Sequence, residues 1–80
     1  MMEPLCFDHP DQKRAEKEAV LRSLDPVEFK ALFQLTRNAA SIARQNGDME
    51  RLYALTRGVK TLQRISGERG FVLAVRRPSP

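Results

Sequence analysis

The sequence predicts an all-α fold, built on an antiparallel helical hairpin over about residues 26–46 and 48–66. Apolar and small residues recur at intervals of three and four in both ranges, which is the spacing of an amphipathic helix. The connection between them is only Asn46-Gly47-Asp48. In it, Gly47 can take the left-handed conformation that ends a helix, and Asp48 can cap the next one. Because the connection is so short, we expect the two helices to be antiparallel neighbours.

The start of the first hairpin helix carries its own local signals. Asp25 is a favoured N-cap residue, and Pro26 suits the first helical position because its missing N–H group would be unpaired there in any case. Glu28 stands where a capping box places an acidic residue. These residues predict that the helix begins at Pro26.

The remaining segments are shorter, and the whole of 1–80 is predicted to be a single small helical domain. A shorter N-terminal helix is expected over about residues 10–24, although its apolar face is thin. The apolar run 71–75 is rich in β-formers and favours a short extended segment. Residues 1–9 and 76–80 are expected to be flexible.

Residues 31–48 resemble residues 51–68 at an offset of 20, which suggests an internal repeat. Both copies contain a Leu-aromatic-x-Leu-Thr-Arg pattern and end in a glycine followed by an acidic residue. The repeat predicts an apolar seam between the two helices. Its expected members are Leu32, Leu35, Ala39, Ile42 and Ala43 on the first helix and Leu52, Leu55, Val59, Leu62 and Ile65 on the second.

Four larger apolar side chains fall at the margins of this seam or outside it: Phe29, Phe33, Met49 and Tyr53. A two-helix hairpin buries only one side of each helix, so either the other segments of the chain cover these residues or a partner does. We therefore treat them as candidate protein-interface residues. Two hairpins packed as a dimeric four-helix bundle would cover them.

The charge is unevenly distributed along the chain. Residues 1–28 carry seven acidic and four basic side chains, whereas residues 29–80 carry ten basic and three acidic ones. Residues seven apart lie nearly on one line along a helix, which places basic stripes on both hairpin helices. The candidate contacts for an anionic partner are Lys30, Arg37, Arg44, Arg57, Lys60 and Arg64. Nucleic acid is one such partner, and the alternative is a solvated flank that aids solubility.

Residues able to perform catalysis or to bind a metal are few. Cys6 is the only cysteine and His9 the only histidine. A Cys–His nucleophile pair needs a third, orienting group, and a structural zinc site needs four ligands, for which only Asp8 and Asp11 could be added. The sequence contains no glycine-rich phosphate loop. We therefore expect no enzyme activity, no cofactor and no metal site.

The expected setting is the cytoplasm, with no membrane partner. No apolar run approaches the roughly 20 residues that span a bilayer, and the first residues lack the basic and apolar regions of a signal peptide. A lone cysteine suits a reducing compartment.

The preferred hypothesis is a small non-enzymatic helical interaction protein, acting as a regulator, adaptor or inhibitor. It would bind another protein and self-associate as a homodimer. The alternative is a basic nucleic-acid-binding regulator that uses the arginine stripes on the two repeat helices.

Overall fold

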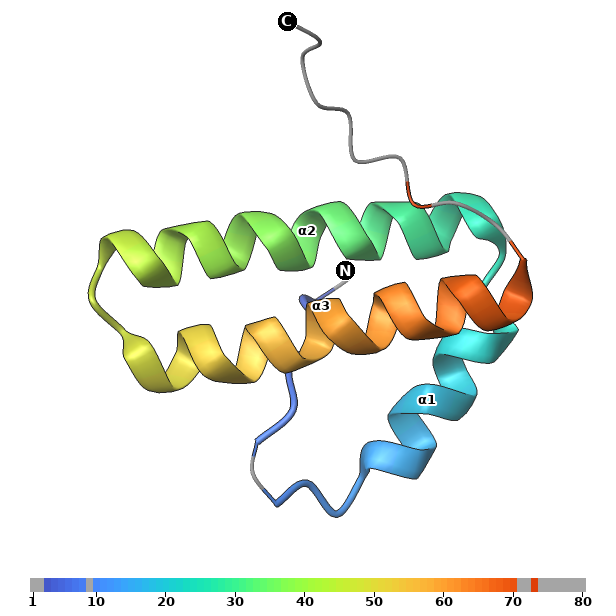
Figure 1. Ribbon diagram of the computed structural model, residues 1–80, viewed down its shortest axis with the longest axis horizontal. Helices are drawn as coiled ribbons and strands as arrows, with labels where there is room; N and C mark the ends of the chain where they lie inside the picture. The colour runs from blue at the N-terminus through green and yellow to red at the C-terminus, as the bar shows by residue number, and fades with distance from the viewer. Residues whose placement is uncertain (1–2, 9, 71–72, 74–80) are drawn as a thin grey trace, which may run out of the picture.

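The computed structural model describes residues 3–8, 10–70 and 73, and its described residues form three α-helices and no strand (Figure 1). The helices are α1 (Arg14–Ser23), α2 (Pro26–Gln45) and α3 (Met49–Arg69). Helices α2 and α3 lie side by side and antiparallel, and α1 packs obliquely against the C-terminal half of α3 (Figure 1). The predicted all-α fold and helical hairpin are therefore confirmed. None of the described helices is long and apolar enough to cross a membrane.

The predicted start of α2 is also confirmed. The Asp25 carboxylate accepts a hydrogen bond from the Glu28 N–H group at 2.8 Å, and Pro26 is the first helical residue. At the turn, Gly47 has a φ of +73°, and the Asp48 carboxylate accepts from the N–H group of Arg51 at 3.3 Å. The local cap and turn residues thus set the position of the hairpin turn.

Helix α3 extends beyond the predicted end near residue 66. Gly67 lies within the helix, and the left-handed residue that ends it is Gly70, with a φ of +80°. Contacts with α1 explain this extension. The Arg69 guanidinium donates to the Leu21 carbonyl at 3.0 Å, and the Glu68 carboxylate accepts from Arg22 at 3.1 Å. Docking of α1 therefore stabilises the last turn of α3.

Helix α1 is shorter than expected and begins at Arg14 rather than near residue 10. The Asp11 carboxylate accepts from the Lys13 N–H group at 2.8 Å and pairs with the Lys17 ammonium at 2.7 Å. These contacts form a turn that precedes the helix.

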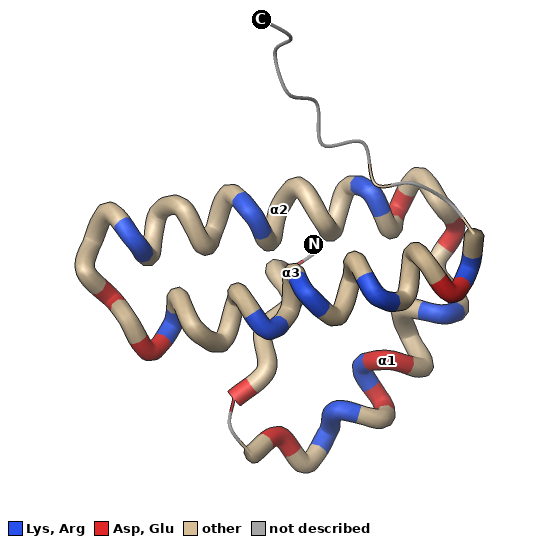
Figure 2. Tube along the Cα trace, viewed as in Figure 1, with Lys and Arg blue, Asp and Glu red and all other residues tan. Residues whose placement is uncertain are grey.

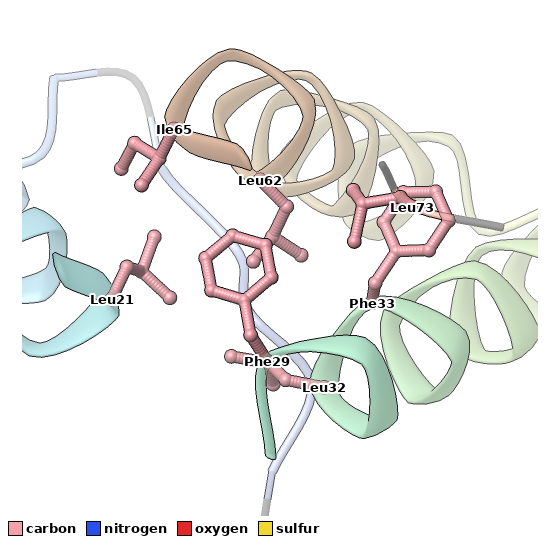
Figure 3. Close-up of a cluster of buried hydrophobic side chains, with 7 residues drawn as sticks. All are labelled: Leu21, Phe29, Leu32, Phe33, Leu62, Ile65 and Leu73. Carbon is pink, nitrogen blue, oxygen red and sulfur yellow. The ribbon is translucent and has the colours of Figure 1, made fainter. Parts of the chain in front are cut away.

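The main apolar cluster lies at the end of the hairpin that α1 covers. It comprises Leu21, Phe29, Leu32, Phe33, Leu62, Ile65 and Leu73 (Figure 3). Phe29 and Phe33 are 0% and 4% exposed. They were candidate interface residues, with cover by other segments of the chain as the alternative, and the structure buries both of them in a cluster with Leu21 of α1 and Leu73.

The buried face of α2 is rotated relative to the predicted seam. Its buried residues are Phe29, Leu32, Phe33, Thr36 and Ala43. Ile42, which was expected in the seam, is 58% exposed, and Leu35 is only half-buried. The two phenylalanine rings lie one turn apart, and burying both of them removes more apolar area from water than burying Leu35 and Ile42 would.

Residues 3–8, which we name the N-terminal strap, cross the hairpin in extended form (Figure 1). The N–H group of Phe7 donates to the Ala54 carbonyl at 3.0 Å, and that of Leu5 donates to the Thr36 hydroxyl at 3.0 Å. The Phe7 side chain is fully buried. The sequence predicted flexibility here, whereas the structure packs the strap against α2 and α3.

Two other sequence predictions fall largely outside the described residues. Residues 76–80 and all of the 71–75 segment except Leu73 are not described, so the extended conformation expected there is untested. Leu73 itself is buried in the main cluster.

Candidate anion-binding site

The predicted basic stripe on α2 remains at the surface. Basic residues recur along both α2 and α3 (Figure 2). On α2, Lys30, Arg37 and Arg44 are all exposed, and the Arg37 guanidinium lies 5.7 Å from the centre of the Phe33 ring.

The predicted stripe on α3 has a different environment. Arg57, Lys60 and Arg64 line a shallow pocket of about 240 Å³ between α1 and α3, together with Thr61 and Arg14. We name these five residues the basic pocket. Positions 57, 60, 61 and 64 share one face of α3 because of the helical repeat. Helix α1 contributes the fourth cation.

The two stripes lie on opposite sides of the hairpin. Arg57 and Arg64 contact the strap and α1, whereas Arg37 stacks on Phe33. Figure 3 shows Phe29 between Leu21 of α1 and Phe33, and it shows Leu73 beside Phe33. The six predicted cations therefore do not form one continuous surface.

Three of the four cations in the basic pocket are held in place by the fold. Arg57 donates to the Phe7 carbonyl at 2.9 Å. Arg14 lies over the Phe7 ring at 4.6 Å and donates to the Thr61 hydroxyl at 3.5 Å. Arg64 pairs with Glu68 on the next turn of α3 at 2.7 Å and with Glu18 of α1 at 2.9 Å. Because a guanidinium carries five N–H groups in a rigid fork, these contacts orient the side chains without using all their donors.

Lys60 differs from its neighbours because it is exposed and makes no hydrogen bond or ion pair with residues 3–8, 10–70 or 73. Its ammonium group can therefore move toward a ligand without disturbing the fold. It is the residue of the pocket best suited to mutational tests.

One carboxylate, Glu18, lies between the arginines of the pocket. It pairs with Arg64 at 2.9 Å and with Arg14 at 3.3 Å, and its side chain is only 15% exposed. The hydrogen bond from Arg64 is the main reason why the pKa of Glu18 falls below its usual value, and the same pair raises the pKa of Arg64. Glu18 and Arg64 therefore stay ionised at neutral pH. Four cations against Glu18 and Glu68 leave the pocket with a net positive charge.

The arrangement provides positive charge and N–H donors on two packed helices. Such donors bind phosphate, sulfate or carboxylate groups, and arginine does so with two parallel hydrogen bonds. The sequence identified Arg57, Lys60 and Arg64 but missed Arg14. A long-range contact brings Arg14 to the pocket, and the only local signal was its spacing of four from Glu18, which is typical of a helical ion pair.

The other two predicted interface residues are exposed and lie one turn apart on α3. Met49 is 47% exposed and Tyr53 is 54% exposed. Tyr53 borders a polar hollow that it shares with Asp8, Glu50 and Arg57.

An apolar groove of about 380 Å³ lies between the strap, α1 and α2. Its apolar lining includes Leu5, Val20, Leu24 and Leu32, with Cys6 at the margin.

The Cys6 and His9 region carries no metal-binding group among the residues that can be described. Cys6 is a free, half-buried thiol, and His9 lies outside the described residues. Across residues 3–8, 10–70 and 73, no three histidine, cysteine or acidic side chains are grouped closely enough to hold a metal ion.

Comparisons with known proteins give no relative for this chain: no protein family matches the sequence, and no curated protein or solved structure is significantly similar to it.

Proposed function

We propose that the protein is a small non-enzymatic helical interaction protein, a regulator, adaptor or inhibitor, that binds an anionic group of another macromolecule. The observation that supports this most is the entry of Arg14 from α1 into the same pocket as Arg57, Lys60 and Arg64 of α3. Clustered cations repel each other and lower the stability of the compact state. A bound anion relieves that repulsion, which is a reason for a fold to retain them.

The proposal is tested by changing Lys60 and comparing it with a cation on the other side of the hairpin. Lys60→Glu places a negative charge in the basic pocket, and Arg44→Glu is the matched control, because Arg44 is equally exposed and lies outside the pocket. Immobilised wild-type protein and both variants would be incubated with extract of the native host, with and without nuclease.

We expect a macromolecule that wild type and Arg44→Glu retain and that Lys60→Glu loses, because the reversed charge repels the anionic group. Nuclease treatment identifies that macromolecule as protein or nucleic acid. Equal retention by all three proteins would contradict the proposal.

A second candidate function is nucleic-acid binding through both arginine stripes. It is supported by the exposed cations on α2, Lys30, Arg37 and Arg44, which pair with no carboxylate of the described residues. This function predicts affinity that falls steeply with salt. It also predicts weaker retention of a DNA duplex by Arg37→Glu. Because the two stripes lie on opposite sides of the hairpin, it further requires a nucleic acid that wraps the molecule.

Self-association as a dimeric four-helix bundle also stays a proposal, as does a cytoplasmic location. With Phe29 and Phe33 buried inside the chain, a dimer would rest on exposed side chains such as Ile42, Met49 and Tyr53. Sedimentation equilibrium distinguishes the 9.1 kDa chain from its dimer.

A further inference from the structure

We infer that the group bound in the basic pocket is a phosphate monoester carried by a protein segment with basic flanking residues. This inference rests on the proposed function and specifies its ligand. It is carried by the small size of the pocket, by the charge it offers, and by the carboxylates that border it.

The pocket is sized for one anionic group rather than for a chain of them. The first and last of its three cations on α3 are seven positions apart, which is roughly 10 Å along a helix. The fourth cation, Arg14, extends the site sideways onto α1 and not along α3. A nucleic-acid backbone presents a regular series of phosphates and is followed by an equally extended row of cations. The stripe on α2 cannot extend the row, because it lies on the other side of the hairpin.

Carboxylates border the pocket on both sides along α3. Beyond Arg57, the adjoining hollow is lined by Asp8 of the strap and by Glu50. Beyond Arg64, Glu68 accepts from Arg64 and Arg22 and is 44% exposed. Although Arg22 and Arg64 offset the charge of Glu68, a polyanion that left the pocket past Arg57 would meet the negative charges of Asp8 and Glu50. A peptide that carries one phosphate and neighbouring lysines or arginines would instead be attracted by them.

A phosphate monoester also matches the charge of the pocket better than a carboxylate does. It carries about −1.5 to −2 charges at neutral pH and three acceptor oxygens. Arg14, Arg57 and Arg64 can each offer further N–H groups to such an anion, and Lys60 adds a mobile ammonium group. A carboxylate has one charge and would leave more of these donors without an acceptor.

The test uses defined anionic probes and two variants that should keep the fold. The probes are a fluorescent degenerate peptide library with a central phosphoserine, the same library with serine, inorganic phosphate and a single-stranded oligothymidylate of similar length. The proteins are wild type, Lys60→Gln and the control Arg44→Gln. Helical circular dichroism establishes that each variant is folded, and fluorescence anisotropy measures binding.

We expect wild type and Arg44→Gln to bind the phosphoserine library at least about tenfold more tightly than the serine library, because charge-assisted hydrogen bonds to phosphate are strong. Lys60→Gln should weaken phosphoserine binding several-fold and leave serine binding unchanged. Peptides recovered from the bound fraction should be enriched in lysine and arginine beside the phosphoserine. Inorganic phosphate should bind much more weakly than the library.

Three results would overturn the inference. Equal binding of the phosphoserine and serine libraries would exclude a phosphate group. Inorganic phosphate that binds as tightly as the library would exclude a protein segment as its carrier. Tighter, Lys60-dependent binding of the oligothymidylate would assign the pocket to nucleic acid. Each of these results is compatible with Lys60-dependent retention of a macromolecule from the host extract. The proposed function, binding of an anionic group, is therefore contradicted only by the extract experiment.

Discussion

The path of the strap depends on a single glycine. Gly58 lies in the middle of α3, where a glycine is about 1 kcal/mol less favourable than alanine. The Leu5 carbonyl packs directly against its Cα, and any Cβ at this position would clash with that carbonyl. Packing of the strap offsets this cost, because burial of the Phe7 ring stabilises the folded state by roughly 2–3 kcal/mol. An interior helical glycine was therefore a local sign of a close backbone approach.

We predict that Gly58→Ala lowers the free energy of unfolding by about 1–3 kcal/mol, since the added methyl group must displace the strap. The matched control is Gly67→Ala in the same helix. A Cβ at Gly67 meets nothing within 4 Å, and its φ is not positive. That control should be stabilising by about 0.5–1 kcal/mol. Urea denaturation followed by helical circular dichroism measures both changes.

A gain in stability for both variants would mean that the strap does not lie on Gly58. Removing residues 3–8 supplies a second check. In the chain without residues 3–8, Gly58→Ala should raise the free energy of unfolding as much as Gly67→Ala does, because the Leu5 carbonyl that clashes with the added methyl group is absent.

At the scale of the helices, the two copies of the suggested repeat are not equivalent. Phe33 is 4% exposed, but Tyr53, at the matching position, is 54% exposed. Ile42 is 58% exposed, but its match Leu62 is fully buried. The strap and α1 contribute unequal contacts to the two helices, so similar sequences present different faces to the core.

One feature of the pattern is common to both helices: the Thr36 and Thr56 hydroxyls each donate to the carbonyl four residues before, at 2.8 Å. Only Thr36 also accepts a hydrogen bond, from the strap. Common ancestry of the two copies stays a hypothesis.

The different environments of Phe33 and Tyr53 lead to a paired prediction. Phe33→Ala should lower the free energy of unfolding by about 3 kcal/mol or more, because it opens a cavity in the main cluster. Tyr53→Ala should change it by no more than roughly 0.5 kcal/mol, as is typical of exposed positions. Thermal and urea denaturation of both variants make the comparison. Equal losses would indicate that the two helices are buried symmetrically, as the repeat suggested.

The sequence predicted those elements that local residues determine. Asp25 and Pro26 place the start of α2, and Gly47 with Asp48 places the turn of the hairpin. The rotation of α2 could not be predicted, because it depends on which segment covers Phe33.

The same reason explains what was missed in the candidate site. Arg57, Lys60 and Arg64 were identified from their spacing along one helix, but Arg14 reaches the pocket only because α1 packs against α3. The strap was missed for an equivalent reason. The short apolar run that ends at Phe7 gives no local sign of its partners, because the hydrogen bonds of the Phe7 backbone are to Ala54 and Arg57, about 50 residues away along the chain.

Over the whole molecule, the acidic N-terminal part is joined to the basic remainder by ion pairs. Three arginines and two glutamates form one network of alternating charge, with Arg14, Glu18 and Arg22 on α1 and Arg64 and Glu68 on α3. This network holds α1 against the hairpin and holds two cations of the basic pocket in position. The assembly of the three helices therefore depends on whether its two carboxylates are ionised.

The sign of the pH dependence follows from these carboxylates. Hydrogen bonds from Arg64 and Arg22 lower the pKa of Glu18 and of Glu68, respectively, below the ordinary value of 4.5. A carboxyl group whose pKa is lower in the folded state stabilises that state fully above its unfolded pKa. The contribution is lost as the pH falls through the folded pKa. We therefore expect the free energy of unfolding to be steady near neutral pH and to decline once the pH falls below about 4.5.

Glu18→Gln removes the central carboxylate of this network, and we predict two effects. At neutral pH it should lower the free energy of unfolding by roughly 1 kcal/mol, since three charge-assisted pairs, with Arg14, Arg22 and Arg64, are lost at a partly shielded position. Below pH 4.5 the variant should lose less stability than wild type, because one of the titrating groups is gone. Glu16→Gln is the control, since Glu16 is an exposed residue of the same helix and joins none of these ion pairs. Urea denaturation across the acidic range measures the slopes, and a Glu18→Gln slope equal to that of wild type would place the acid sensitivity outside the interface between α1 and α3.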